Sequence, residues 1–163
     1  MQFKLPSVTF MGHKLTDQGV KPDSDKNSAI REMPRPVDKA GVQRFLGMCR
    51  YLSKFCPSLS ETVLPLRNLM KQNVEFNWTM AQESAFVSAK RLIASSTSLR
   101  YYNVKLPVTL QVDASDEAIG GVLMQEGKPV CFTSHTLNDT EKQYAQIEKE
   151  FLAIVTCMRK WHQ

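Results

Sequence analysis

An aspartate, Asp113, ends an apolar run typical of a buried strand, in the stretch LQVDASDEAIGG. Small residues follow it, and the chain returns through Gly120 and Gly121, which let another group approach the backbone closely. A bare carboxylate in such a place suits Mg2+, which takes one or two hard oxygen ligands from a protein together with water and phosphate oxygens. An aspartate at a strand end is more often an ordinary turn residue, so this segment alone leaves both alternatives open.

Two further carboxylates, Glu148 and Glu150, lie in a segment whose apolar residues recur with helical spacing. Residues 145–161, AQIEKEFLAIVTCMRKW, are predicted to form one long amphipathic helix. The expected apolar stripe consists of Ile147, Phe151, Ile154, Val155, Met158 and Trp161. Because Glu148 and Glu150 lie at opposite edges of this stripe, periodicity does not choose between them.

Cysteine spacing and hydropathy exclude several other classes of site. The four cysteines form no CxxC pair and have no histidine at metal-ligand spacing, so we expect reduced, mostly buried thiols. No apolar run approaches the roughly 18 residues of a membrane span, and the first ten residues lack the apolar core of a signal peptide. We therefore expect a soluble, intracellular protein without a membrane partner, with one domain or two small ones in 163 residues.

Charge divides the chain into two parts. Residues 1–105 contain 16 Lys and Arg against eight Asp and Glu, whereas residues 106–163 contain five against eight. A basic first part suggests a polyanionic partner, although a solvated basic surface with no partner is an equally common outcome.

The first part is predicted to be a β-hairpin followed by helices. Residues 2–20 are β-rich with a turn at TDQG, and Asp23 or Ser24 can cap a short helix that ends before the PRP at 34–36. Asp38 can cap an amphipathic helix reaching toward Phe55, whose basic side chains point away from its apolar residues. Two more helices are expected, one opened by Pro65 and one by the capping box TMAQ at residues 79–82.

From residue 106 the pattern changes to that of strands. The segments VTLQVDA, IGGVLMQ and PVCFTSH, separated by short turns, predict a three-stranded antiparallel meander, followed by the long helix. The predicted fold class is therefore α+β: a β-hairpin and a helical region, then a meander with one helix.

Six ordered stretches carry a resemblance to the Pol polyprotein of gypsy-type LTR retrotransposons. They are VTFMGHKLTDQGVKPD, AIREMPRP, VQRFLGMCRYLSKFCPSLSETVLPLRNLMK, FNWTMAQESAFVSAKRLI, LQVDASDEAIGGVLMQ and YAQIEKEFLAIV. The resemblance covers almost the whole chain. It implies the end of a reverse transcriptase palm at 1–22, a thumb-like region at 23–105, and the first half of an incomplete ribonuclease H-like domain at 106–163.

The resemblance also implies two nucleic-acid-binding elements. The primer grip, a hairpin that holds the growing 3′ end, would fall on Phe10, Met11, Gly12 and His13. The alternative for these residues is an amphipathic hairpin in a core. The thumb helix, which follows the backbone of a duplex, would present Arg44, Arg50 and Lys54.

Asp113 and Glu150 fall, by this resemblance, on the first two carboxylates of a ribonuclease H metal site, which chooses Glu150 over Glu148. In that chemistry two metal ions roughly 3.5 to 4 Å apart activate water and stabilise the leaving oxygen, with several carboxylates holding them. Only two of the four expected carboxylates are present, and no Y-x-D-D pair of a polymerase site occurs. His135 and Leu52 also depart from the commoner family residues, Arg and an aromatic.

We therefore expect a fragment of a retroelement reverse transcriptase/ribonuclease H, inactive in isolation, whose complete form uses Mg2+. Its expected partners are RNA–DNA hybrid or duplex nucleic acid and the remainder of the polyprotein. The expected location is the cytoplasm or virus-like particles, with the nucleus as an alternative. Two other hypotheses are a non-catalytic nucleic-acid-binding remnant and a decayed product without function.

Overall fold

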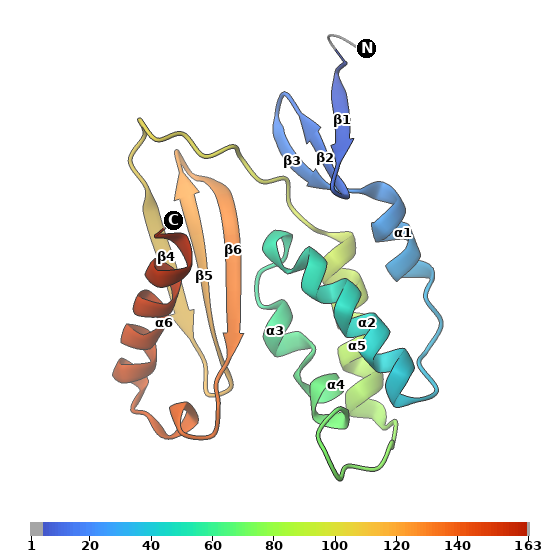
Figure 1. Ribbon diagram of the computed structural model, residues 1–163. Coiled ribbons are helices and arrows are strands. Elements are labelled where there is room, and N and C mark those ends of the chain that lie inside the picture. Colours follow the sequence, from blue (N-terminus) through green and yellow to red (C-terminus); the bar gives the residue numbers. More distant parts are fainter. Residues whose placement is uncertain (1–4, 163) are drawn as a thin grey trace.

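A computed structural model describes residues 5–162. The first residues of the expected hairpin (2–4) and the last residue of the expected second part (163) lie outside this range. In Figure 1 a small sheet stands above a cluster of helices, and a second sheet with one helix lies beside them. The predicted α+β fold class is confirmed.

The small sheet has three strands instead of the two expected. Strands β1 (Ser7–Phe10), β2 (His13–Thr16) and β3 (Gly19–Pro22) form an antiparallel meander. Strand β3 pairs with β2 from His13↔Pro22 to Thr16↔Gly19, and on its other side Val20 exchanges two backbone hydrogen bonds of 2.8 Å with Leu99, more than seventy residues later in the chain. The bridge to Leu99 is a long-range pairing that has no local sequence signal.

The helical region follows the expected caps closely. Asp23 accepts a hydrogen bond at the start of α1 (Ser24–Glu32), and Asp38 accepts one from the Gly41 N–H at 2.6 Å at the start of α2 (Lys39–Leu52). A short 3₁₀ turn, η1 (Ser53–Phe55), continues α2, and then come α3 (Leu59–Thr62), α4 (Leu64–Leu69) and α5 (Met80–Ala94). The capping box at Thr79 is present. These side-chain caps satisfy backbone N–H groups that have no partner inside a helix.

The core of this region is built from apolar residues of α2, α4 and α5 together with the segments between them. Phe45 of α2 is fully buried, and its ring centroid lies 4.7 Å from that of Phe86 on α5. Phe55 and Leu66 are also fully buried. The core therefore fixes the direction of α2, whose other faces carry the basic side chains.

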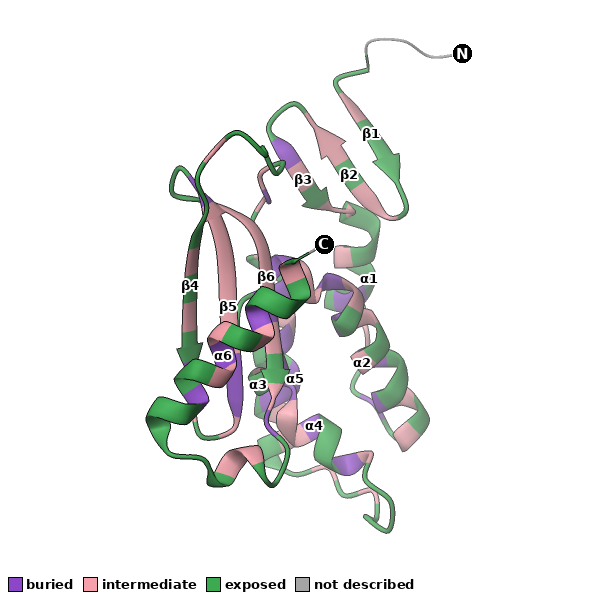
Figure 2. Cartoon of the chain, turned by 60° about the vertical axis from the view of Figure 1, so that its left-hand side comes forward, coloured by how far each residue is buried: buried purple, intermediate pink, exposed green. Residues whose placement is uncertain are grey.

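The second sheet has the predicted order β4 (Thr109–Ala114), β5 (Ala118–Gln125) and β6 (Lys128–Thr136). After the short turn η2 (Glu141–Gln143), helix α6 (Gln146–Trp161) packs on β4 and β5 (Figure 2). Strand β6 contacts η1 and α3 of the helical region. Ser134 donates a 2.7 Å hydrogen bond to Ser60, and Arg67 donates a 2.9 Å hydrogen bond to Thr136.

Helix α6 turns a different face to the sheet from the one expected. The residues that meet the sheet include Lys149, Ala153 and Cys157, all buried. Ile147 and Phe151 of the predicted apolar stripe are instead 63% and 62% exposed. The expected inward orientation of this stripe is wrong because the small Ala153 and Cys157 let α6 approach Gly121 of β5, which a row of large residues would prevent.

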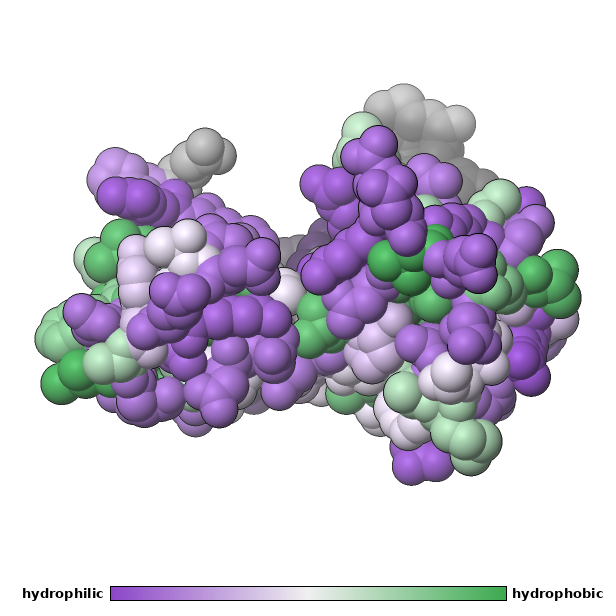
Figure 3. Space-filling view, turned by 90° about the horizontal axis from the view of Figure 1, so that it is seen from below, coloured by the Kyte–Doolittle hydropathy of each residue, from purple (hydrophilic) through white to green (hydrophobic). Residues whose placement is uncertain are grey.

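Seen from below, the molecule has two lobes joined by a narrower waist, with apolar patches on both (Figure 3). Among the helices of residues 5–162, none combines the length and the hydrophobicity needed to cross a membrane.

Candidate nucleic-acid interface and carboxylate sites

The tip of the first hairpin is a two-residue loop that presents apolar side chains to solvent. Phe10 pairs with His13 across the two strands, so only Met11 and Gly12 lie in the loop. Both have positive φ, 46° and 71°, which is the conformation of a type I′ turn, the turn that matches strand twist. Phe10 is 59% exposed and Met11 is 76% exposed. A hairpin with its apolar tip in a core, the alternative for these residues, is therefore not what the structure shows.

This tip lies against the end of helix α2. The ring of His13 stacks on that of Tyr51, with centroids 5.0 Å apart and planes 12° from parallel. The hydroxyl of Tyr51 donates a hydrogen bond to the carbonyl oxygen of Met11. Lys26 of α1 places its Nζ 3.8 Å from the centre of the Tyr51 ring. Three elements that are separate in sequence therefore meet at Tyr51.

A groove runs between α1 and α2 beside this junction. Its volume is about 410 Å³, and its polar lining side chains are Lys26, Arg44 and Tyr51, with Gly47 among the lining residues. Arg44, Gly47 and Tyr51 lie on one face of α2 because residues three and four apart are neighbours on a helix. A side chain at Gly47 would meet no other atom within 4 Å, so the surface there is open.

The three basic residues predicted for the thumb helix do not share one surface. Arg44 lines the groove, whereas Arg50 is exposed about 120° farther round the helix, at about 100° per residue. Lys54, in η1, extends over the ring of Phe55, and partial burial lowers the pKa of its ammonium group. The structure thus places Arg44 in the groove with Tyr51 and Lys54 over the ring of Phe55, and leaves Arg50 apart. Their role in binding stays a prediction.

The charges around the junction are mostly positive. Partial burial lowers the pKa of His13, and the nearby ammonium groups of Lys54 and Lys26 lower it further, with Asp23 opposing. Within residues 5–162, no carboxylate lies within 4 Å of a cationic nitrogen of Lys26, Arg44, Arg50 or Lys54. A cationic surface without ion pairs is suited to a phosphate backbone.

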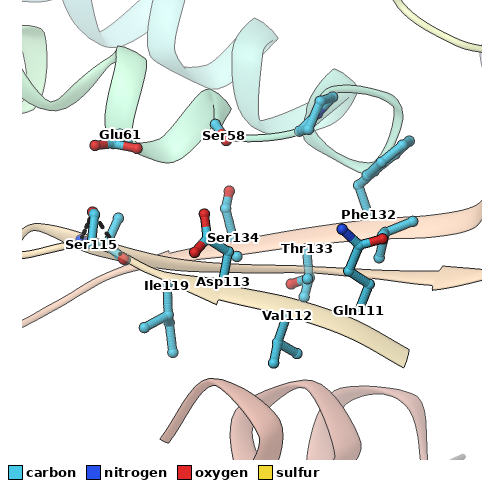
Figure 4. Close-up of a pocket in the computed structure, with 15 residues that line it drawn as sticks. Ser58, Glu61, Gln111, Val112, Asp113, Ser115, Ile119, Phe132, Thr133 and Ser134 are labelled. Carbon is cyan, nitrogen blue, oxygen red and sulfur yellow. Dashed lines mark hydrogen bonds between the residues drawn. The ribbon is translucent and has the colours of Figure 1, made fainter. Parts of the chain in front are cut away.

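Asp113 lies on the face of the second sheet that is turned away from α6. It pairs with Gly120 in the adjacent strand, and its Oδ1 accepts a 3.0 Å hydrogen bond from the Ala114 N–H. Figure 4 shows Val112 and Ile119 pointing toward the helix while Asp113 points the opposite way. There it lines a pocket of about 150 Å³ whose other side is formed by α3, with Glu61 facing the sheet.

Glu150 lies on α6 and is exposed. The neighbouring Glu148 caps the start of the helix, because its Oε2 accepts a 2.8 Å hydrogen bond from the Ala145 N–H. Because α6 packs on the face opposite Asp113, the structure does not bring Asp113 and Glu150 together. In the described part of the chain, no three His, Cys, Asp or Glu side chains are grouped so that they could hold a metal ion. The donor groups of residues 5–162 therefore do not fit a two-metal centre, and the metal-binding roles of Asp113 and Glu150 stay predictions.

Sequence reasoning missed three residues of these sites: Lys26, Tyr51 and Glu61. Tyr51 follows Arg44 by seven residues, the spacing of one helix face, so periodicity could have added it to the basic surface. Lys26 and Glu61 had no such signal, since tertiary packing alone places them.

The helical lobe and the three-stranded meander with one helix together have the fold of part of a solved reverse transcriptase. The structure of a foamy viral protease–reverse transcriptase in complex with RNA/DNA hybrid superposes with a TM-score of 0.85, at 22% identity, over 95% of this chain and 22% of that one. A second structure of the foamy viral enzyme, in complex with dsDNA, gives 0.83 over 94% of this chain and 33% of that one. At this identity the likeness shows the fold.

Sequence comparison identifies the family. The profile of the RNase H-like domain found in reverse transcriptase matches residues 78–163, and the chain belongs to this family. The Tf2-3 and Tf2-4 transposon polyproteins of Schizosaccharomyces pombe are each 30% identical to it over 165 aligned residues, 98% of this chain. The resemblance to a retrotransposon Pol polyprotein is thereby confirmed. The chain spans about 12% of the length of these relatives, and the boundaries expected after residues 22 and 105 stay predictions.

Proposed function

We propose that this chain holds the nucleic acid of a retroelement reverse transcriptase, binding an RNA–DNA hybrid or another duplex by its backbone. The observation that carries the proposal is the cationic junction of the hairpin tip, α1 and α2, where Lys26, Arg44 and Lys54 have no ion-pair partner among the described residues. Foamy viral enzymes with the same fold are known in complex with RNA/DNA hybrid and with dsDNA, which supports this partner class. Contacts to phosphates carry no sequence information, so binding is independent of sequence.

The test is a titration of a fluorescent RNA–DNA hybrid at several salt concentrations. Replacing Lys26, Arg44 and Lys54 together by Ala weakens binding and flattens the salt dependence, because each lost phosphate contact reduces the slope of log K against log salt by about 0.9. The matched control is the triple Ala replacement of Lys105, Lys128 and Arg159, which removes the same charge from exposed positions away from the junction. Absence of salt-sensitive binding, or an equal loss in the control, would overturn the proposal.

Cleavage of the RNA strand belongs, in this proposal, to the complete ribonuclease H domain. Enzymes with this fold depend in general on divalent cations, and we propose Mg2+ as the ion. The described carboxylates do not fit a two-metal centre, so in this proposal they do not carry out the cleavage step by themselves.

The separation of Asp113 and Glu150 favours a second candidate, a non-catalytic nucleic-acid-binding remnant. Such a remnant binds the hybrid as described above and leaves the RNA strand intact when Mg2+ is present. Gel electrophoresis of the hybrid after incubation with the protein shows whether the RNA strand has been cut. Cutting that is lost in Asp113→Asn would exclude the remnant.

A further inference from the structure

Tyr51 connects the hairpin tip to α2 by several contacts at once. Its hydroxyl bonds the carbonyl of Met11, 40 residues earlier in the chain, and its ring stacks on His13. The ring of Phe55, four residues after Tyr51, lies 5.5 Å from that of His13 at a tilt of 60°. The tip is thus held at its backbone and at a side chain by one short stretch of α2 and η1.

Gly12 shows how closely the two elements approach. A Cβ at this position would clash with the hydroxyl oxygen of Tyr51 and with Nζ of Lys26. Its φ of +71° is in addition one that residues with a side chain rarely adopt. The turn therefore favours glycine, and any side chain here would have to displace the ends of Lys26 and Tyr51.

Tyr51 also lines the groove that contains Lys26 and Arg44. It is only half-buried, unlike Phe45 and Leu52 of the same helix, which are fully buried. It packs against the edge of the helical core and is not enclosed in it. Because Tyr51 contacts both the hairpin tip and the groove, it fixes the position of the tip relative to the groove.

We propose that Tyr51 is a positioning residue, which holds the hairpin tip at a fixed distance from the basic groove so that a bound duplex meets both in one register. The inference rests on the proposed function for its nucleic-acid partner. The contact itself exists without nucleic acid, so it can be tested in the free protein. Loss of the contact lets the tip move. A duplex that binds the tip and the groove together must then also fix the position of the tip, and this ordering lowers the affinity.

The experiment compares Tyr51→Phe, which removes the hydroxyl and keeps the ring, with Tyr51→Ala, which removes both. Tyr101→Phe is the matched control, because the Tyr101 hydroxyl also bonds a backbone carbonyl of the small sheet, that of Thr16 at 3.0 Å, away from the tip. Amide hydrogen exchange at Gly12 and His13 is measured in the free protein, and hybrid affinity is measured as above.

In Tyr51→Phe, exchange at the tip accelerates about two- to tenfold, the range expected for one lost hydrogen bond. Hybrid affinity falls while the salt slope stays constant, because no charge is lost. Tyr51→Ala shows larger changes of both kinds, and Tyr101→Phe leaves exchange at the tip unaltered. If Tyr51 only stabilised the fold, its replacement would not lower the hybrid affinity at a constant salt slope.

Unchanged exchange at the tip in both Tyr51 variants would overturn the inference whatever the binding result. Accelerated exchange with unchanged affinity would overturn the positioning role. Failure of the unaltered protein to bind hybrid would overturn the proposed function instead, so the two failures are distinguishable.

Discussion

His13 is the residue whose protonation most directly affects the junction. Its ring lies between Tyr51 and Phe55, and burial together with Lys54 and Lys26 lowers its pKa. Asp23 is the acidic group that opposes this shift. The folded state therefore prefers neutral His13, whereas the unfolded chain takes up a proton near the ordinary pKa of about 6.5.

We expect the free energy of unfolding to decrease as the pH falls through about 6.5 toward the lower pKa of the folded state, because the unfolded state then binds more protons. Below that lower pKa the His13 contribution is fully lost. Urea unfolding between pH 7.5 and 5 measures the effect, and His13→Gln reduces the pH dependence in this window. His162→Gln, the same change at an exposed residue after α6, serves as the control. A pH dependence equal in His13→Gln and the unaltered chain would contradict the assignment.

At the scale of elements, the packing of α6 on its sheet depends on one of two adjacent glycines. A Cβ at Gly121 of β5 would clash with Sγ of Cys157, which is buried on α6. A Cβ at Gly120 would point to the opposite face and meet only the carbonyl oxygen of Thr133, at 3.8 Å. The two glycines are neighbours in the strand, but they face opposite sides of the sheet, and only Gly120 has room for a side chain.

Gly121→Ala is expected to lower the free energy of unfolding by about 1 to 3 kcal/mol, since an added methyl group in a packed interface forces backbone or rotamer shifts. Gly120→Ala is the matched control and is expected to be close to neutral. Urea unfolding of both variants, followed by circular dichroism, makes the comparison. Equal effects at the two positions would show that α6 does not pack on β5 as described.

At the scale of the whole molecule, the outer face of α6 is an exposed apolar surface. Ile147, Phe151 and Met158 lie on this face and are 63%, 62% and 59% exposed. A contiguous apolar surface of this kind favours association. We expect the 163-residue chain to self-associate through it.

Phe151→Glu is expected to shift the chain toward monomer in sedimentation velocity without lowering the free energy of unfolding, because the side chain is exposed. Val37→Glu introduces the same charge at a residue that is 83% exposed in the loop before α2. This control should leave association unchanged. An equal shift in both variants would point to net charge as the cause and not to the face of α6.

Local signals in the sequence were sufficient for most elements. Asp38 and Thr79 cap their helices as predicted, because a cap needs only a side chain and a backbone N–H two or three residues away. Alternation likewise predicted the three strands of the second sheet, since side chains of a strand point to opposite faces in turn. The family resemblance added Asp113 and Glu150 as candidates, which neither caps nor periodicity could choose.

Tertiary structure alone decided which groups meet. Alternation places Asp113 on one face of β4, but only the packing of α6 on the other face separates it from Glu150. Both sides of α6 carry apolar residues, so the close fit of the small Ala153 and Cys157 against β5, and not hydrophobicity, chose the buried side. The contact of Tyr51 with Met11 spans 40 residues, and no local pattern encodes an approach that depends on how two separately folded elements pack.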